Sequence, residues 1–382
     1  MTPSNHILLM SLGQLGRTSR PTRMVRVLER HGSLTVLSPE TPHKNWGCPE
    51  TRHVILPARD RSILNQFNRA AVLLARDFES EIWDKSLSIA YQSIASMSFD
   101  IIFCEDITLL PLAVALRDTR LNRGRTKIVM DGREFYPLQF ENRVVWKFFL
   151  AGFNDYLCRE YLPLADTVFT VSPGLKEAYE KEYGVSCKIL PSYSFFHDIS
   201  PNPTGESIRI IHHGLASAGR KLETMFEIAG LLDSRFSVDF MLVLNEPYYY
   251  KRLEKIADGI PKVRLLPPVP MPQIVKFISQ YDMGLCWFSP KTFNLRHCWP
   301  NKLFECIQAR LALAVAPLPD MAKLVAEKNL GVVATNYNPE SFAMRLNALT
   351  AADLDVFKRN AHHAAYDFCW EKCEDFIASE IG

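Results

Sequence analysis

Lys302 and Glu305 are the two residues whose types and spacing most directly suggest binding chemistry. They follow Pro300 in the stretch Arg296-His-Cys-Trp-Pro-Asn-Lys-Leu-Phe-Glu305. Leu303, Phe304 and Ile307 have the spacing of one buried helical face, so the spacing predicts a helix that begins after Pro300. The first turns of a helix carry unpaired N–H groups, which can hold an anion and hydroxylated groups. An ordinary loop–helix–strand unit with a surface Lys and Glu fits the same spacing.

A second candidate site lies in the same half of the chain. Gly214 begins a loop of small residues that ends in Gly219-Arg220-Lys221, and this places two cations at the start of a helix. Leu266-Pro-Pro-Val269 is a turn after another predicted strand. Arg and Lys bind phosphates and Glu accepts hydrogen bonds from ribose hydroxyls, so the set suits a nucleoside diphosphate. A Walker motif is absent from the sequence, which disfavours ATP hydrolysis of the P-loop type.

Carboxylates and glycines mark the ends of predicted strands in the first half. Glu105 and Asp106 follow the strand 99–104, and Asp131 and Glu134 follow the strand 127–130. The carboxyl ends of strands face the ligand crevice in open α/β sheets, although carboxylates there also cap helices. Gly13-Gln-Leu-Gly16 predicts a turn that admits close backbone approach. It lacks a full GxGxxG, so a dinucleotide cofactor is not supported.

The elements that position these residues alternate between strands and helices, which is typical of an α/β fold with doubly wound sheets. We predict two Rossmann-like domains, residues 1–192 and 208–359, joined by a proline-containing linker at 193–207. A cleft faced by the two domains is the natural ligand site. Residues 64–97 predict one long helix or two. The segment 143–162 predicts a helix that is apolar almost all round, hence a buried interdomain or central helix. With Arg143 and Lys147 it also fits contact with a bilayer surface.

Composition narrows the classes of protein. The chain has 382 residues, is 47% hydrophobic and 23% charged, and has a net charge of +2, which implies no polyanion such as a nucleic acid as partner. Nine cysteines, Cys48 among them, are scattered without a CxxC, which predicts reduced thiols of a cytoplasmic protein. His297-Cys298 and His362-His363 lack zinc-site spacing, so no metal site is expected. The N-terminal sequence is unlike a signal peptide, and no stretch reaches the roughly 18 apolar residues of a membrane-spanning helix.

Several motifs together resemble the GT-B glycosyltransferases, in particular the retaining group 1 class (family four) of bacterial polysaccharide assembly. The most specific is Pro300-Asn301-Lys-Leu-Phe-Glu305 followed by Ala309-Arg-Leu-Ala-Leu-Ala-Val315. Further matches are Arg20-Pro-Thr-Arg23, Val129-Met-Asp-Gly-Arg-Glu-Phe-Tyr136, Asp166-Thr-Val-Phe-Thr-Val-Ser-Pro-Gly174, His213-Gly214 with Arg220-Lys-Leu-Glu223, and Tyr281-Asp-Met-Gly-Leu285. The tail Asp367-Phe-Cys-Trp-Glu371 resembles the family's helix, here about 360–382, that packs back on the first domain.

The resemblance implies an enzyme that transfers a sugar from a nucleotide-sugar donor to a glycan or lipid-linked acceptor in bacterial surface polysaccharide synthesis. The second domain would bind the donor, and the first domain would be the acceptor side. The implied donor contacts are Glu305 for the ribose, Arg220 and Lys302 for the diphosphate, Lys221 and Asn301 beside them, Val269 for the base, and Gly13, Gly16 and Gly214 as close approaches. No metal or other cofactor is implied, because Arg220 and Lys302 take the place of Mg²⁺ on the leaving group.

Two positions depart from the family pattern. His297 stands eight residues before Glu305, where the family often has a Glu that contacts the donor sugar. Arg133 stands in Asp131-Gly-Arg133-Glu134, where the family often has His. We expect His297 to contact the sugar or a phosphate. If the enzyme retains configuration, the donor phosphate suffices as base; if it inverts, Glu134, Asp106 or Glu105 must act.

Two other functions fit the same fold. A sugar-nucleotide epimerase would consume a UDP-sugar without acceptor, and a non-catalytic GT-B-like subunit would bind without turnover. We expect a cytoplasmic location, with peripheral contact at the inner face of the plasma membrane as an option for the 143–162 segment.

Overall fold

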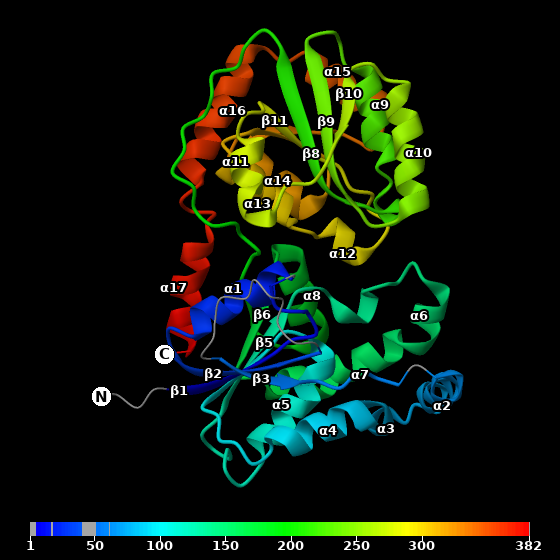
Figure 1. Ribbon diagram of the computed structural model, residues 1–382, viewed down its shortest axis with the longest axis vertical. Helices are drawn as coiled ribbons and strands as arrows, with labels where there is room; N and C mark the ends of the chain where they lie inside the picture. Colours follow the sequence, from blue (N-terminus) through cyan, green and yellow to red (C-terminus); the bar gives the residue numbers. More distant parts are fainter. Residues whose placement is uncertain (1–4, 17, 40–50, 61, 382) are drawn as a thin grey trace. The chain divides into compact units, whose positions relative to one another are not determined.

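The structure is a computed structural model that describes residues 5–16, 18–39, 51–60 and 62–381 (Figure 1). Cys48 lies outside these described residues. The chain divides into two compact units. Unit 1 comprises Met1–Leu190, Thr292–Asn294 and Glu374–Gly382, and unit 2 comprises Pro191–Lys291 and Leu295–Cys373. In the described part of the chain, residues 190–207 hold no helix and only an isolated bridge from Ser194 to Cys369.

Unit 1 is built on a sheet of seven parallel strands in the order β3-β2-β1-β4-β5-β6-β7. Its strands are β1 (Asn5–Met10), β2 (Gly32–Ser38), β3 (Arg52–Ile55), β4 (Ile101–Cys104), β5 (Lys127–Gly132), β6 (Thr167–Thr170) and β7 (Cys187–Ile189). The α-helices of the described residues are α1 (Ser19–Leu28), α2 (Ile63–Leu74), α3 (Phe78–Ile82), α4 (Lys85–Ile94), α5 (Leu110–Arg117), α6 (Val144–Phe149), α7 (Ala151–Tyr161) and α8 (Pro173–Tyr183). Central strands that are apolar throughout, such as Ile101–Cys104, are covered on both faces.

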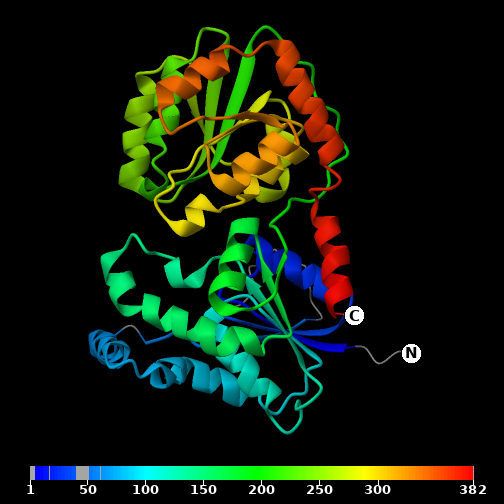
Figure 2. The ribbon, with the colours of Figure 1, turned by 180° about the vertical axis from the view of Figure 1, so that it is seen from behind.

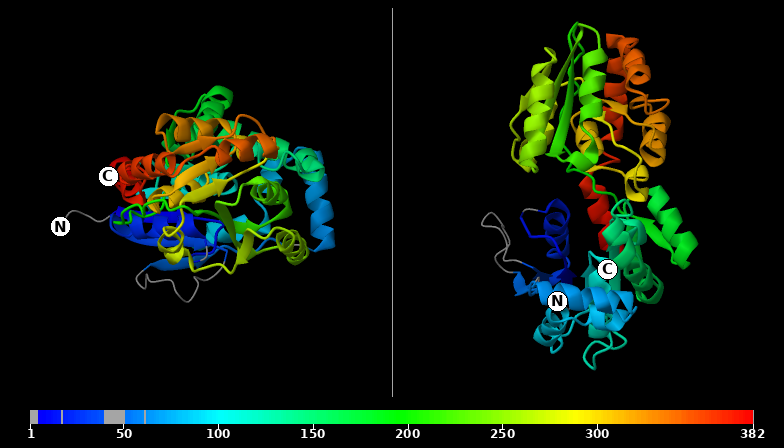
Figure 3. Two further views of the ribbon diagram at one scale, coloured as in Figure 1. Left: turned by 90° about the horizontal axis from the view of Figure 1, so that it is seen from above. Right: turned by 90° about the vertical axis from the view of Figure 1, so that its right-hand side faces the viewer.

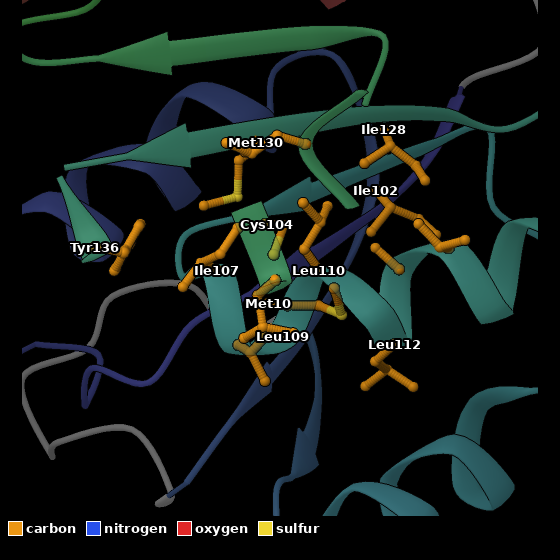
Figure 4. Packing of buried hydrophobic residues seen from close by; sticks show 14 of the residues in the cluster. Met10, Ile102, Cys104, Ile107, Leu109, Leu110, Leu112, Ile128, Met130 and Tyr136 are labelled. Atoms are coloured by element: carbon orange, nitrogen blue, oxygen red, sulfur yellow. The ribbon is translucent and has the colours of Figure 1, made fainter. Parts of the chain in front are cut away.

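The unit 1 core lies where β1, β4 and β5 meet the helical segment after β4. Figure 4 shows these side chains packed together; they are Met10, Ile102, Cys104, Ile107, Leu109, Leu110, Leu112, Ile128, Met130 and Tyr136. Because the strands are buried on both faces, the ends of the strands are where polar side chains can reach a ligand.

Unit 2 repeats the plan with six parallel strands in the order β10-β9-β8-β11-β12-β13. They are β8 (Ile208–Ala216), β9 (Phe236–Leu244), β10 (Val263–Leu266), β11 (Met283–Cys286), β12 (Ala312–Val315) and β13 (Gly331–Val333). The helices between and after them are α9 (Glu223–Leu231), α10 (Pro247–Asp258), α11 (Ile274–Ile278), α12 (Phe293–Arg296), α13 (Asn301–Gln308), α14 (Pro319–Glu327), α15 (Pro339–Asn347) and α16 (Ala351–Ala364). Helices cover both faces of this sheet, as the right-hand view of Figure 3 shows.

In both sheets, the order in which the chain adds strands reverses at one position. The strand order runs outward to one side from β1 in unit 1 and from β8 in unit 2, and then resumes on the other side with β4 and β11. In such sheets ligands bind outside the carboxyl ends of the strands at this switch point. The loop after β8 carries Arg220, and the segment after β11 leads into α13 with Lys302. The topology therefore brings the two predicted cations to one edge.

The C-terminal segment differs from the expected single helix at about 360–382. It contains α16, which ends at Ala364, and α17 (Trp370–Ile381), with a break that is visible in Figure 2. The buried amide of Gln308 explains the break, because its Nε2 donates to the carbonyls of Ala365 and Phe368 at 2.5 and 3.0 Å. These carbonyls are thereby satisfied outside a helical ladder.

Two further predicted helices are also interrupted. The segment 64–97 forms α2, α3 and α4, because Asp77 and Asp84 accept hydrogen bonds from the backbone N–H of Ser80 and Leu87 and so start new helices. The segment 143–162 forms α6 and α7, separated at Leu150. The expectation of a buried helix is wrong for α6, in which Trp146 alone is buried. Among the described residues no helix is long and apolar enough to cross a bilayer.

Candidate functional site

Arg220 and Lys302 converge over Gly214 in unit 2. Gly214 has φ of 141°, and a Cβ placed there would lie 2.9 Å from Lys302 Nζ and 3.4 Å from an Arg220 guanidinium nitrogen. Arg220 ends the short helical turn Ala218–Arg220 after β8, and Lys302 is the second residue of α13. Three of the predicted site residues therefore meet, and the missing side chain at Gly214 is what leaves room for both cations.

Within the described residues, neither Arg220 nor Lys302 forms an ion pair with a carboxylate. Lys302 is only 7% exposed, with Nζ 5.0 Å from the centre of the Phe288 ring. Burial, followed by the nearby Arg220 charge, lowers the pKa of Lys302 to about 8. Burial also lowers the pKa of Arg220 below its usual value. Two desolvated cations held together without an anion are poised to bind one.

His212 supports Lys302 and was not predicted as a site residue. Its Nδ1 lies 2.8 Å from the carbonyl of Leu285, and its Nε2 lies 3.5 Å from Lys302 Nζ. The carbonyl can only accept, so we assign the proton to Nδ1, which leaves Nε2 as an acceptor facing the ammonium group. Burial, and then the Lys302 charge, lower the pKa of His212 well below its usual value. His212 is therefore neutral and orients Lys302.

Glu305 lies one turn along α13 from Lys302, on the helix expected after Pro300. Its Oε2 is 2.7 Å from Nε2 of His213, a buried residue of β8 that was also missed. This contact fixes one carboxylate oxygen of a residue whose charge lies near Lys302. A fixed carboxylate at this place can accept hydrogen bonds from hydroxyl groups.

His297 lies beside an acidic residue. Its Nδ1 lies 3.3 Å from Oδ2 of Asp320, which is in the first turn of α14 and was not predicted. Asn301 is exposed at the first position of α13. A histidine beside a carboxylate can donate from its other ring nitrogen, so this position suits recognition of a hydroxyl or a phosphate oxygen.

The remaining predicted residues of unit 2 are more exposed. Lys221 has φ of 49° and is exposed, and it approaches Lys291, whose pKa is lowered first by that contact. Val269 is half-buried in the loop after β10. Their roles toward a diphosphate and a base stay predictions.

In unit 1 the predicted glycines shape the turn after β1. The N–H of Gly13 donates to Ser11 Oγ at 3.0 Å, and a Cβ at Gly13 would lie 2.9 Å from the Thr18 hydroxyl. Gly16 has φ of 83° and donates to Thr22 Oγ1 at 2.8 Å. The turn is tightly folded back on itself, as close backbone approach requires.

Of the carboxylates at the strand ends of unit 1, two have hydrogen-bond partners within the protein and two can act on a ligand. Asp131 is buried in a bidentate pair with Arg20, at 2.6 and 2.7 Å, and Asp106 caps the turn that begins at Ile107. Glu105 is fully buried; the Ser11 hydroxyl is near enough to lower its pKa, but neither carboxylate oxygen has a hydrogen-bond partner among the described residues. Burial raises the pKa of Glu105 to about 7 and also raises the pKa of Glu134. Glu105 and Glu134 are thus the carboxyls available for acid–base work.

Neither a disulfide nor a metal site is formed by the cysteines and possible metal ligands that the structure describes. All eight described cysteines are unbridged, and all but Cys298 are buried. Over the described ranges, no group of three or more His, Cys, Asp and Glu side chains is arranged to hold a metal ion.

Replacing Gly214 with alanine should disturb both the backbone and the cations. We expect a loss of about 1–3 kcal/mol in the free energy of unfolding from the left-handed φ, and about tenfold weaker UDP binding because Lys302 must move. Chemical denaturation and calorimetric titration measure the two effects. Gly230→Ala in α9 is the control, since a Cβ there has only Ile260 within contact distance, at 3.9 Å. Unchanged UDP affinity in Gly214→Ala would separate Gly214 from the site.

No protein-family model matches the sequence, and no curated protein matches it. Solved structures do match over nearly the whole of both chains. HepE of Anabaena in complex with UDP-glucose has a TM-score of 0.70 at 12% identity, with 99% of each chain covered. A UDP-forming alpha,alpha-trehalose-phosphate synthase of Burkholderia vietnamiensis has a TM-score of 0.66 at 12% identity over 99% of each chain. The E. coli trehalose-6-phosphate structure bound with UDP-2-fluoro glucose has a TM-score of 0.69 at 12% identity over 98% of each chain. With its two Rossmann-like units, the chain has the GT-B fold of these glycosyltransferases, which confirms the fold predicted from the sequence.

Proposed function

We propose that this protein is a glycosyltransferase that transfers a sugar from a nucleotide-sugar donor, bound by unit 2, to an acceptor on unit 1. The observation that carries the proposal is the meeting of two cations, Arg220 and Lys302, over Gly214, with no carboxylate paired to either in the part of the chain that the structure describes. Glu305, held by His213 one turn further along α13, is the proposed ribose contact. HepE was solved with UDP-glucose, so UDP-glucose is the first donor to test.

The cations would act on the leaving group. As the glycosidic bond to phosphate breaks, negative charge grows on the diphosphate, and fixed positive groups stabilise it in the transition state. Arg220 and Lys302 would supply this stabilisation in place of a metal ion, with His297 and Asp320 beside the sugar. We therefore expect turnover to persist in a chelator such as EDTA.

The acceptor side and stereochemistry are proposed from the family resemblance. We propose retention of configuration, with the donor phosphate as base, and a glycan or lipid-linked saccharide of bacterial surface polysaccharide as acceptor. If the product is inverted instead, Glu105 and Glu134 are the candidate bases, since Asp131 and Asp106 already have partners.

A donor panel tests the function. Thermal shifts with UDP-, GDP-, dTDP- and CMP-sugars should show stabilisation by one nucleotide class, because a ligand that binds the folded state raises its stability. The stabilising donor is then incubated with saccharide and lipid-linked acceptors, and released nucleotide is measured. Stabilisation by none of the donors would contradict the proposal. Donor conversion without any acceptor would indicate an epimerase, and binding without nucleotide release would indicate a non-catalytic subunit.

Donor binding should depend on pH through Lys302. Because its pKa is about 8, Lys302 is charged below that pH and neutral above it in the free protein. A bound diphosphate favours the charged form, so binding above pH 8 must take up a proton, and affinity should fall by up to about tenfold per pH unit. Phosphate itself does not titrate there, since its second pKa is about 6. Titration of UDP in buffers of different ionisation enthalpy measures the uptake; no uptake at pH 9 would contradict the assignment.

A further inference from the structure

Helices α2 and α6 of unit 1 contact each other and expose large apolar side chains. On α2 these are Ile63, Leu64 and Phe67, and on α6 they are Val144, Val145 and Phe148; each is between 69% and 83% exposed. In both helices they have the spacing i, i+1 and i+4, which places them on one helical face. The two helices lie side by side in Figures 1 and 2. We call these six residues the α2–α6 face.

The helices α2 and α6 themselves carry charges of one sign, although Asp60 and Asp77 flank α2, Glu141 precedes α6, and Arg69 is paired with Glu81 at 2.7 Å. Residues 62–76 and 142–150 contain no Asp or Glu, whereas they contain Arg69, Arg76, Arg143 and Lys147. Arg143 and Lys147 are exposed and flank the apolar residues of α6. Exposed apolar side chains with the cations Arg143 and Lys147 beside them fit an anionic lipid surface, into which the apolar groups insert while the basic groups meet the headgroups. Exposure to water alone would leave the six apolar side chains without an explanation.

A cavity inside unit 1 extends from the helices α2 and α6 to the strand ends. It has a volume of about 1480 Å³, larger than the roughly 300–1,000 Å³ of ordinary small-molecule pockets. Its walls include Val72 of α2 and Trp146 of α6, and it reaches Asp106 and Tyr136 at the carboxyl ends of β4 and β5. Its lining also includes Leu12, Leu87, Phe140 and Phe153, together with charged residues such as Arg59 and Glu81. An amphiphile in a lipid surface could reach the strand ends along this cavity.

We propose that the α2–α6 face docks unit 1 on an anionic lipid surface, so that the acceptor is drawn from the lipid rather than from solution. That the acceptor comes from the lipid rests on the proposed glycosyltransferase function, whereas the docking of unit 1 does not. The lipid-linked alternative is thereby favoured over a free glycan.

Vesicle co-sedimentation tests the docking. The full chain should bind vesicles of phosphatidylcholine mixed with phosphatidylglycerol, and it should bind pure phosphatidylcholine on the order of tenfold more weakly. Val145→Asp/Phe148→Asp should weaken binding to the mixed vesicles by on the order of tenfold or more, and Arg143→Gln/Lys147→Gln should do the same at low salt but less at high salt. Tyr248→Asp/Met344→Asp is the matched control, because these residues of unit 2 are at least as exposed, at 93% and 73%.

The outcomes are distinguishable. No binding to anionic vesicles, or equal loss in the control pair, would overturn the docking. Concentration-dependent dimers in vesicle-free solution that Val145→Asp/Phe148→Asp abolishes would overturn it too, because the face would then bind a second copy of the chain. Calorimetric titration with UDP separates this proposal from the function: the α6 variants should bind UDP normally. UDP binding without vesicle binding defeats only the docking, and vesicle binding without binding of any nucleotide defeats only the function.

Discussion

Arg220→Ala is expected to lower turnover by on the order of 10²-fold or more, because it removes a preorganised charge from the leaving diphosphate. The side chain is partly buried, forms no ion pair within the described residues, and lies with Lys302 over Gly214. Its charge is therefore available to the ligand rather than to the protein. The effect should fall mainly on kcat, since charge on the leaving group is greatest in the transition state.

Steady-state nucleotide release, with the donor and acceptor that the panel selects, measures this effect. Arg252→Ala is the matched control, because Arg252 is an exposed cation of unit 2 whose partner, Glu223, lies 3.5 Å away. Arg220→Lys should recover part of the turnover, as it restores the charge without the planar fork. Near-normal turnover in Arg220→Ala would remove Arg220 from the reaction. A matching loss of stability would instead indicate a structural role, so both variants need a denaturation curve.

The parts of the fold and site that the sequence predicts are those with local signals. Apolar runs such as Leu313–Ala316 indicate buried parallel strands, and their alternation with helices indicates doubly wound units. Lys302 and Glu305 lie in α13 as expected, since Pro300 and the apolar spacing that follows are sufficient to place a helix start. Gly214 and Arg220 follow from the same strand–loop–helix logic.

The histidines that orient the site carry no local signal. His212 and His213 lie within β8, and their partners Leu285 and Glu305 are 73 and 92 residues away along the chain. A pair of histidines in a strand is compatible with many contacts. The partner of His212 follows only from the pairing of β8 with β11, and the partner of His213 only from the position of α13. Asp320 was missed for the same reason, although an acidic residue in a first helical turn is a signal that could have drawn attention to it.

The α6 helix shows a different limit. A helix that is apolar all round has no polar face to mark its solvent side, so periodicity cannot say which side is buried. Trp146 is the residue that packs inward, against Phe140 with ring centres 5.9 Å apart, and its apolar neighbours are left exposed. The helix boundaries in 64–97 are easier to predict from the sequence, because Asp77 and Asp84 are N-cap residues and aspartate is a favoured residue at that position.

Lys302→Met is expected to weaken UDP binding about 10- to 100-fold without weakening the fold. Methionine keeps an unbranched side chain of similar length in the buried space beside Phe288 and His212 but carries no charge. Burial lowers the folded-state pKa of Lys302 to about 8, which means that the folded protein holds the charged form at a cost. The unfolded chain therefore binds more protons between about pH 8 and the unfolded pKa of 10.5, and wild-type stability rises with pH through that window.

Two measurements on Lys302→Met should consequently move in opposite directions. The melting temperature of the nucleotide-free variant should equal or exceed that of the wild type at pH 7, because a desolvated charge has been removed. The additional stabilisation by UDP should shrink, because it depends on the ratio of ligand concentration to Kd. Lys302→Arg serves as the control that keeps a charge, and its affinity should lie between the two. If Lys302→Met bound UDP as the wild type does, the buried ammonium over Gly214 would not be a phosphate ligand, and the donor site would have to lie elsewhere in the protein.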